Sequence, residues 1–189
     1  MASEMIERSK QGLLDCLAID DGDLTVRGWC RRDVDLRAEW PPYPPPYSEF
    51  TSAIGAMAPA ERDAYYRVRD QDQRRITLTA DHASESCIAH MALLDANRGE
   101  GTVDNMGLRV HPNWCGRGVG TRVLRLVVTR LTDAGFQHFR LDVSEANARA
   151  IRCYEKVGFV RTEPFNRDGV PFCWMALESS EVEHGMDQI

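Results

Sequence analysis

The feature that most constrains the fold is the segment "HPNWCGRGVGTRVLRLVV", His111 to Val128, in which three glycines precede a long apolar-periodic run. The apolar positions after the glycines have helical spacing. They are Val123, Leu124, Val127, Val128 and Leu131. The first turn of a helix carries unpaired N–H groups and the positive end of the helix dipole, and glycines let the backbone approach a phosphate closely. The segment therefore predicts a site for a phosphorylated ligand.

The spacing of the glycines excludes two common phosphate-binding motifs. A Walker A loop needs G-x-x-x-x-G-K-[ST], and a dinucleotide fingerprint needs G-x-G-x-x-G followed by an acidic residue about 20 positions later. The sequence "GRGVGTRVL" contains neither pattern. A glycine-rich helix start without any ligand remains an alternative interpretation.

The remaining elements predict a mixed α/β fold. The chain begins with a short helix or loosely held arm, followed by a strand at Leu24–Trp29. Two helices come next, at Arg32–Trp40 and Pro59–Arg75, with the proline-rich "PPYPPPY" between them. Strands are expected at residues 76–80, 86–96 and 102–112, then the glycine corner and its helix, a strand at 139–143, and a helix at 147–159. The closing segments 159–165 and 169–178 form a hairpin at "NRDG". This order predicts a mostly antiparallel central sheet with helices on both faces.

Length and composition indicate one soluble globular domain over residues 1–189, with residues 1–22 as an amino-terminal arm and 179–189 as a mobile tail. The chain has 189 residues, of which 43% are hydrophobic and 28% are charged. A net charge of -6 argues against nucleic acid or an anionic membrane as partner. No apolar stretch suits a signal peptide or a membrane span, so a cytoplasmic protein is expected.

The cysteines and histidines give no sign of a metal site. Six cysteines are scattered without a C-x-x-C pair, and none of the five histidines stands in H-E-x-x-H spacing. We therefore expect no metal, and free thiols in a reducing compartment.

Two motifs together resemble the GNAT superfamily of acyl-CoA-dependent N-acyltransferases. The glycine-rich segment has the x-x-G-x-G form of that family's pyrophosphate loop, between a strand ending in V-x-P and a long amphipathic helix. The later segment "NARAIRCYEKVGF" matches the family pattern N-x-x-A-x-x-x-Y-x-x-x-G-F. The resemblance covers residues 102–165 well, and it implies a GNAT-like fold and an N-acetyltransferase that uses acetyl-CoA (coenzyme A) as cosubstrate.

The resemblance implies which residues bind coenzyme A: amides of the loop cradle the pyrophosphate, and backbone groups of the preceding strand run alongside the pantetheine arm. The implied residues are Leu108, Val110, Cys115, Gly116, Arg117, Gly118, Val119, Gly120, Thr121, Asn147 and Tyr154. Arg117 and Arg122 would add positive charge. Cys115 stands where the family commonly has Gln or Arg, which removes a possible side-chain contact and leaves the amide cradle unchanged.

The resemblance also implies the catalytic groups. Tyr154 would protonate the departing thiolate as general acid, and the Val110 amide would stabilise the oxyanion. A base must accept the proton of the amine, whose pKa is near 10.4 when unperturbed. Asp104 is the candidate for that base, with Glu100 second, and a solvated surface carboxylate is the alternative interpretation of each.

The sequence leaves the acceptor open. A primary amine of a small molecule or of a protein fits, and the acidic residues Asp33, Asp35 and Glu39 are compatible with a cationic amine or with a solvated surface. The aromatic residues Trp40, Tyr43, Tyr47 and Phe50 could wall an acceptor pocket or serve packing alone. A catalytically silent acyl-CoA-binding or interaction module is the second functional hypothesis. The apolar strand at 169–178 could serve a homodimer or the core.

Overall fold

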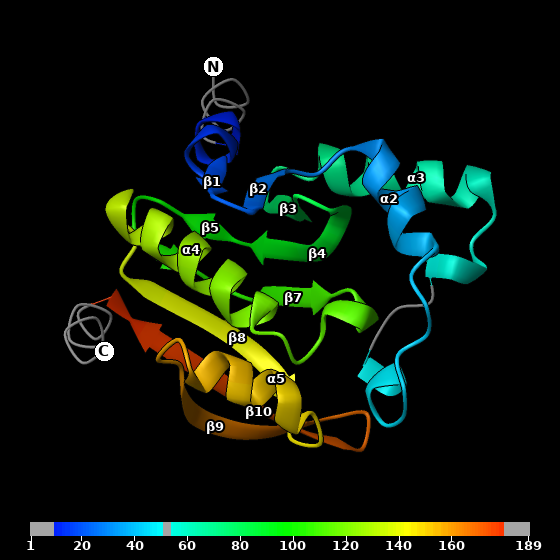
Figure 1. Ribbon diagram of the computed structural model, residues 1–189. Helices are drawn as coiled ribbons and strands as arrows, with labels where there is room; N and C mark the ends of the chain where they lie inside the picture. The colour runs from blue at the N-terminus through cyan, green and yellow to red at the C-terminus, as the bar shows by residue number, and fades with distance from the viewer. Residues whose placement is uncertain (1–9, 51–53, 180–189) are drawn as a thin grey trace.

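The computed structural model of the chain describes residues 10–50 and 54–179, and its ribbon is shown in Figure 1. Residues 10–16 are helical, and the later helices are α2 (Arg31–Ala38), α3 (Pro59–Gln71), α4 (Val119–Asp133) and α5 (Ala148–Glu155). Three short 3-10 turns are η1 (Tyr47–Phe50), η2 (Ile54–Ala56) and η3 (Pro112–Trp114). The expected helices are therefore confirmed, in the expected order. The tail predicted at 179–189 lies, apart from its first residue, outside the described residues.

The strands form two five-stranded sheets rather than one central sheet. The first has the order β1-β2-β3-β4-β7, and the second has the order β5-β6-β8-β10-β9. The strands are β1 (Ile19–Asp21), β2 (Leu24–Gly28), β3 (Arg75–His82), β4 (Glu85–Leu94), β5 (Ala96–Asn97), β6 (Thr102–Val103), β7 (Met106–Val110), β8 (His138–Ser144), β9 (Val160–Arg167) and β10 (Val170–Glu178). The ladders among the described residues are antiparallel apart from β6–β8, so the mostly antiparallel character is as predicted.

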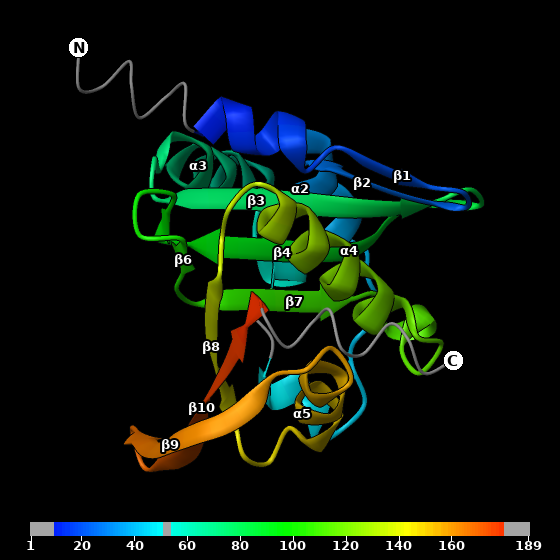
Figure 2. The same ribbon diagram turned by 90° about the vertical axis from the view of Figure 1, so that its left-hand side faces the viewer.

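Helices cover both faces of the first sheet, as the sequence predicted. Figure 2 shows α4 crossing one face of β3, β4 and β7, with α2 and α3 on the other face, while β8, β9 and β10 turn away below β7. The two sheets separate from each other between β7 and β8. These two strands lie close together without forming a ladder. α5 lies beside this parting (Figures 1 and 2).

The strand predicted at residues 102–112 is in fact two strands in different sheets. Asn105 has a φ of +55°, a left-handed conformation that interrupts the extended backbone. β6 before it pairs with β8, and β7 after it pairs with β4. Asp104 lies in this break and is exposed, so it is not part of one continuous strand leading to the glycine loop, contrary to the prediction of a strand at 102–112. The break is where the chain passes from one sheet to the other.

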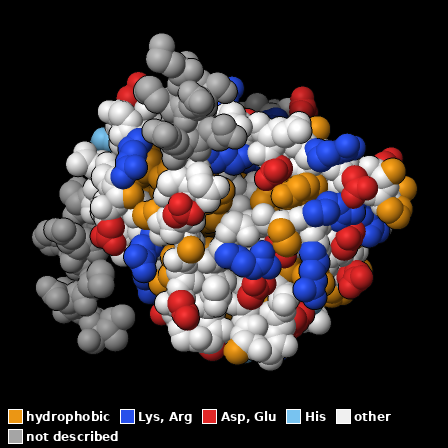
Figure 3. Space-filling model, turned by 90° about the horizontal axis from the view of Figure 1, so that it is seen from above, with side chains coloured by type: hydrophobic (Ala, Val, Ile, Leu, Met, Phe, Trp, Pro, Cys, Tyr) orange, Lys and Arg blue, Asp and Glu red, His pale blue; other side chains and the backbone are white. Residues whose placement is uncertain are grey.

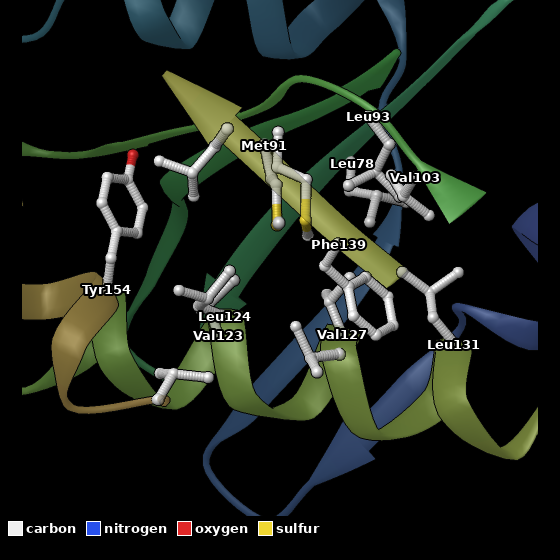
Figure 4. Packing of buried hydrophobic residues seen from close by; sticks show 14 of the residues in the cluster. Leu78, Met91, Leu93, Val103, Val123, Leu124, Val127, Leu131, Phe139 and Tyr154 are labelled. Atoms are coloured by element: carbon white, nitrogen blue, oxygen red, sulfur yellow. The ribbon is translucent and has the colours of Figure 1, made fainter. Parts of the chain in front are cut away.

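The core lies between α4 and the sheets. The apolar stripe predicted from the period of α4 is buried, with Val123, Leu124, Val127, Val128 and Leu131 all at most 1% exposed. Figure 4 shows Val123, Leu124, Val127 and Leu131 facing side chains of β3, β4 and β8. Buried apolar surface of this kind contributes roughly 25 cal/mol per Å² to folding. α4 is therefore fixed firmly enough to position the loop at its amino end.

The amino-terminal arm is part of this packed structure from residue 10 onward. Leu13 and Leu17 are buried in the main core, at 3% and 0% exposure. The Arg122 guanidinium on α4 bonds Asp21 (Nε to Oδ2, 2.6 Å) and Asp23 (Nη1 to Oδ1, 2.6 Å). Of the two alternatives predicted for this segment, residues 10–16 form the short helix, and apolar burial and ion pairs hold the segment on α4.

The closing hairpin forms as predicted, around a two-residue turn at Asp168 and Gly169, both with positive φ. Within it, β10 has a ladder partner on each side, β8 and β9. An intersubunit sheet joined through β10 is therefore excluded, and β10 belongs to the interior of its own sheet.

Basic and acidic side chains are interspersed on the face seen in Figure 3. Several of the arginines around α2 and α3 pair with acids, as in Arg31–Asp35 (2.9 Å) and Arg62–Asp35 (3.3 Å). The most buried acid of this region is Asp33, whose side chain is fully buried. Asp33 accepts two hydrogen bonds of 2.8 Å from Arg27 and one of 2.7 Å from the Cys30 amide.

Asp33→Asn is expected to destabilise the protein. Burial acts to raise the pKa of Asp33, but the bonds from Arg27 and Cys30 outweigh it and hold the pKa below its usual value. The ionised carboxylate therefore stabilises the fold above the unfolded-state pKa of about 3.9, and this stabilisation is lost as the pH falls through the lower folded pKa. Urea unfolding near neutral pH should show a loss of about 1–3 kcal/mol, since the charge-assisted bonds to Asp33 are weakened while Asp81 still pairs with Arg27 (2.7 Å).

The control is Asp20→Asn on exposed β1, which should change the free energy of unfolding by less than about 0.5 kcal/mol. An Asp33→Asn protein as stable as this control would contradict the role of the buried pair.

Candidate active site

A cavity of about 350 Å³ opens where the two sheets part. It is bounded by β7, the glycine loop, α5 and the aromatic η1 region. Its lining includes nine of the residues predicted from the sequence. They are Leu108, Val110, Cys115, Gly116, Gly118, Gly120, Thr121, Asn147 and Tyr154. The fold thus brings together two motifs that the sequence separates by a whole helix and a strand.

The glycine loop exposes backbone amides to this cavity. Gly116 and Gly118 have φ values of +77° and +81°, the left-handed region that favours glycine, and Gly118 is the N-cap of α4. Within the described residues, no side chain caps α4. The first amides of the helix therefore remain available to an anion.

Gly120 brings α4 unusually close to β7 and α5. A Cβ at this position would lie 3.2 Å from Val110 Cγ2 and 3.3 Å from Cys153 Sγ. Glycine at this position therefore lets the helix start sit directly over the end of β7. Close packing here keeps the amides and the strand edge in one cavity.

The backbone of β7 presents alternate residues to the cavity side. The Leu94 amide donates to the Asn105 carbonyl (3.2 Å), and the His111 amide donates to the Ile88 carbonyl (2.8 Å). Because bonding alternates along an antiparallel ladder, the N–H and C=O groups of Leu108 and Val110 point away from β4. The Val110 carbonyl accepts from Tyr43 Oη at 2.6 Å, which fits this direction. The Val110 amide thus faces the parting, where an extended ligand can pair with it.

Tyr154 reaches the same place from α5. It is 6% exposed, and its ring lies 6.0 Å from that of Phe159, with the hydroxyl directed away from α5 (Figure 4). Burial raises the pKa of Tyr154 well above its usual value, and a hydrogen bond with the Leu108 backbone opposes that shift without cancelling it. The phenol is therefore protonated at neutral pH.

Asn147 and Cys115 have local structural roles as well. The Asn147 side-chain oxygen accepts a hydrogen bond from the Ala150 amide (3.2 Å), so Asn147 is the N-cap of α5, as predicted. Cys115 Sγ lies 3.5 Å from the Val110 carbonyl, and burial raises the pKa of this thiol. Cys115 is therefore a neutral thiol that packs beneath the loop.

Positive charge surrounds the cavity, and the sequence analysis missed most of it. Arg149, Arg152 and Lys156 of α5 line the cavity together with Arg109 of β7. The three α5 residues follow i, i+3, i+7 spacing, which places them on one helix face and is a signal that the sequence contains. The lining residues include no aspartate or glutamate. The cavity is thus suited to an anionic ligand.

The aromatic residues before α3 form the opposite wall. Tyr43, Tyr47 and Phe50 line the cavity, and the Arg149 guanidinium lies 3.9 Å from the ring centre of Tyr47. Trp40 does not line it, and its indole donates to the Cys87 carbonyl at 3.1 Å. The pocket-wall interpretation therefore fits three of the four aromatic residues.

Other predicted residues lie elsewhere. Arg117 and Val119 line a second cavity, and the Arg117 guanidinium lies 5.4 Å from the Trp114 ring centre. Arg122 is ion-paired to Asp21 and Asp23, so it brings no unpaired charge to the loop. Asp104 and Glu100 are exposed and outside the cavity lining.

A carboxylate that the sequence analysis did not single out lies nearer to Tyr154. The Asp142 side chain on β8 is 8% exposed and lies 2.9 Å from Arg167 Nη1. Its charge contributes to the raised pKa of Tyr154, so the two groups interact electrostatically. In the sequence, Asp142 is one polar residue in an alternating strand, and only the fold shows its proximity to α5.

Two further findings concern the described residues alone. No group of three or more His, Cys, Asp or Glu side chains in residues 10–50 and 54–179 could hold a metal ion. No helix in that part of the chain is long and apolar enough to cross a membrane.

One cavity contains the uncapped amides of α4 and an edge of β7 without a ladder partner among the described residues, at the point where the two sheets part. This arrangement defines a class of mixed α/β proteins that bind an anion at the helix and an extended ligand along the strand. Comparison with known sequences is consistent with this class. The profile of the acetyltransferase (GNAT) family matches residues 35–159. The chain belongs to the GNAT acetyltransferase family, as the two motifs predicted.

Curated relatives match a shorter part of the chain. A kanamycin resistance protein of Rhizobium radiobacter and an aminoglycoside N(6')-acetyltransferase type 1 of Klebsiella pneumoniae are each 47% identical over 69 residues, 36% of this chain. The match spans 64% of the first relative and 34% of the second.

Solved structures share the fold over a greater length. A spermidine N-acetyltransferase from Vibrio cholerae, in complex with CoA and spermine, superposes with a TM-score of 0.70 at 18% identity, over 86% of this chain and 99% of that one. The yncA protein of Salmonella typhimurium, with its cofactor acetyl-CoA, gives a TM-score of 0.59 at 19% identity, over 83% and 94% of the two chains. These similarities show the GNAT fold.

Proposed function

We propose that the protein is an acetyl-CoA-dependent N-acetyltransferase that acts on a primary amine. The observation that carries the proposal is the meeting of the α4 amides, the Val110 amide and the buried Tyr154 phenol in one cavity. The family and the amine-acetylating relatives support the same reaction.

The residues present fit coenzyme A. The amides of Gly116, Gly118, Gly120 and Thr121 would hold its pyrophosphate, with Arg149, Arg152 and Lys156 adding positive charge. The edge of β7 that faces the parting has no ladder partner among the described strands, and the pantetheine arm would lie along it at Leu108 and Val110, where the Val110 carbonyl already accepts from Tyr43. Acetyl-CoA supplies the activated acetyl group as a thioester.

The chain would supply two groups to the reacting thioester. The Val110 N–H donates to the carbonyl oxygen while the amine nitrogen bonds to the carbonyl carbon. Tyr154 Oη then donates its proton to the sulfur as the carbon–sulfur bond breaks, and it is reprotonated by the proton that the amine releases. Its raised pKa keeps Tyr154 protonated for this role.

The base has two candidates. Asp104, predicted from the sequence, is exposed in the break between β6 and β7. The Asp142 side chain is 8% exposed and paired with Arg167, and its charge acts on Tyr154, although Asp142 does not line the cavity either. Burial and the interaction with the phenol favour Asp142 as the group that takes the first proton, from the ammonium form of the acceptor, directly or through water. The second proton, released after the carbon–nitrogen bond forms, is the one that returns to Tyr154.

Asp142→Asn is expected to lower kcat/KM by about tenfold or more, because the amide cannot accept the proton. Asp104→Asn is the matched control and should leave the rate unchanged. The reverse outcome, with Asp104→Asn slow and Asp142→Asn unaffected, would restore the sequence-based prediction.

A catalytically silent acyl-CoA-binding module is the second candidate, because no carboxylate lines the cavity. A thiol-release assay over a panel of amines, preceded by calorimetric titration with acetyl-CoA, decides between the two functions. Binding with release on at least one amine supports the enzyme. Binding without release on any amine supports the silent module, and no binding contradicts both.

A further inference from the structure

A row of polar side chains crosses the first sheet on the face opposite α4. Thr79 of β3 pairs with His90 of β4, and His90 pairs with Arg109 of β7. Leu108 and Val110 contact the α4 side, where a Cβ on Gly120 would meet both side chains. Because neighbouring side chains of a strand point to opposite faces, Arg109 points toward the α2 and α3 side. This polar row is therefore separate from the amides of the glycine loop.

Arg37 of α2 lies against this row and has no acidic partner in the part of the chain that the structure describes. Its guanidinium lies 5.5 Å from the ring centre of Trp40 and interacts with Tyr65. Arg37 is 6% exposed, and its Nε and Nη1 atoms have no hydrogen-bond partner among the described residues. The same is true of the buried Arg109 Nε and of His90 Nδ1. Burial, followed by the charges of Arg37 and Arg109, holds the pKa of His90 well below its usual value. Two cations and a neutral imidazole thus share one buried region.

Two nearby arginines, Arg27 and Arg62, are placed differently, because each of them reaches an acid. Arg27 pairs with Asp33 (2.8 Å), and Arg62 pairs with Asp35 (3.3 Å). No ion pair in the described part of the chain involves Arg37 or Arg109. A buried cation without a partner is costly, so an anion that reaches it gains binding free energy. The site accordingly lacks one component, which is a negative charge.

We propose that Arg109, with Arg37 beside it, binds a carboxylate of the acetyl acceptor, so that the acceptor is a small molecule that carries both a primary amine and a carboxylate. This inference rests on the proposed N-acetyltransferase function. Arg109 also lines the cavity that contains Val110 and Tyr154. A carboxylate held at Arg109 places the rest of the acceptor, including its amine, beside the reacting groups. Arginine suits this role because its planar fork matches a carboxylate.

The test compares amino acids with amines that lack the carboxylate. Thiol release from acetyl-CoA is measured with each of the proteinogenic L-amino acids, with its methyl ester, and with spermidine and kanamycin as amines without a carboxylate. We expect at least one free amino acid to exceed its ester in kcat/KM by about tenfold or more, since a charge-assisted bond to arginine is lost in the ester.

Substitutions of the two arginines test whether they cause the preference for the free carboxylate. Arg109→Gln should raise KM for the preferred acid by about tenfold and leave KM for its ester unchanged. Arg37→Met should act in the same direction, and Arg109→Gln keeps the test valid if the Arg37 variant fails to fold. Arg74→Gln, an exposed arginine paired with Asp95, is the matched control and should change neither value.

The outcomes separate the inference from the function on which it rests. Turnover of esters, spermidine or kanamycin at rates equal to or above those of the acids would overturn the carboxylate site and leave the enzyme in place. Equal losses for acid and ester in Arg109→Gln would overturn it as well. Bound acetyl-CoA with no turnover of any compound would overturn the proposed function and the carboxylate site together.

Discussion

Gly118→Glu is expected to abolish binding of acetyl-CoA. Gly118 caps α4 with a φ of +81°, and it lines the cavity among the amides that would hold the pyrophosphate. A glutamate at this position places a carboxylate against a ligand of the same charge and strains the backbone, which costs about 1–2 kcal/mol for an L-residue in this conformation. Calorimetric titration should show at least a hundredfold weaker binding, about 2.7 kcal/mol.

The control for Gly118→Glu separates backbone strain from ligand binding. Gly169, in the β9–β10 turn, has a φ of +84° and, like Gly118, open space where a Cβ would lie. Gly169→Glu should therefore lose similar stability in thermal unfolding and retain the affinity of the unchanged protein for acetyl-CoA. If Gly118→Glu binds acetyl-CoA as tightly as Gly169→Glu does, the glycine loop is not the coenzyme site.

The sequence was sufficient for those parts of the site that depend on local structure. The amide cradle follows from glycines next to an apolar helical period, and the position of Tyr154 follows from its place on α5 behind an Asn147 cap. Each of these signals spans a few turns of chain. Local propensity and capping decide such segments, so the sequence predicts them well.

The parts that failed depend on pairing between distant residues. Asp104 was misplaced because the positive φ of Asn105 and the change of sheet after β6 have no local sequence signal. Arg122 was expected near the pyrophosphate, whereas its bond partner Asp21 lies 101 positions earlier in the chain. Register and side-chain pairing of this kind are fixed by tertiary packing, which a single sequence does not reveal.

The proposed acceptor site shows the same limit. Arg37 comes from a helix and Arg109 from a strand, and they meet only because β7 pairs with β4 and α2 packs over that pair. In the sequence, the acidic residues of α2 pointed toward a cationic acceptor. The structure pairs those acids with neighbouring arginines and leaves Arg37 and Arg109 without acids.

Tyr154→Phe is expected to lower kcat by about 10²–10⁴-fold, the range of a lost general acid. Phenylalanine keeps the ring that packs near Phe159 and removes only the hydroxyl. Affinity for acetyl-CoA should therefore stay within about twofold of the unchanged protein, because the amide cradle and the β7 edge are intact. Single-turnover kinetics and calorimetric titration measure the two quantities separately.

The pattern of losses identifies the role of the hydroxyl. Because burial keeps Tyr154 protonated through neutral pH, the unchanged enzyme should show no loss of kcat from this group as the pH rises from 7 to 9, and the variant should be slow throughout that range. Tyr66→Phe, a tyrosine that packs on Trp29 outside the cavity, is the matched control and should keep full activity. Equal losses of turnover and coenzyme affinity in Tyr154→Phe would instead make the hydroxyl a structural group, and the leaving thiolate would then take its proton from water.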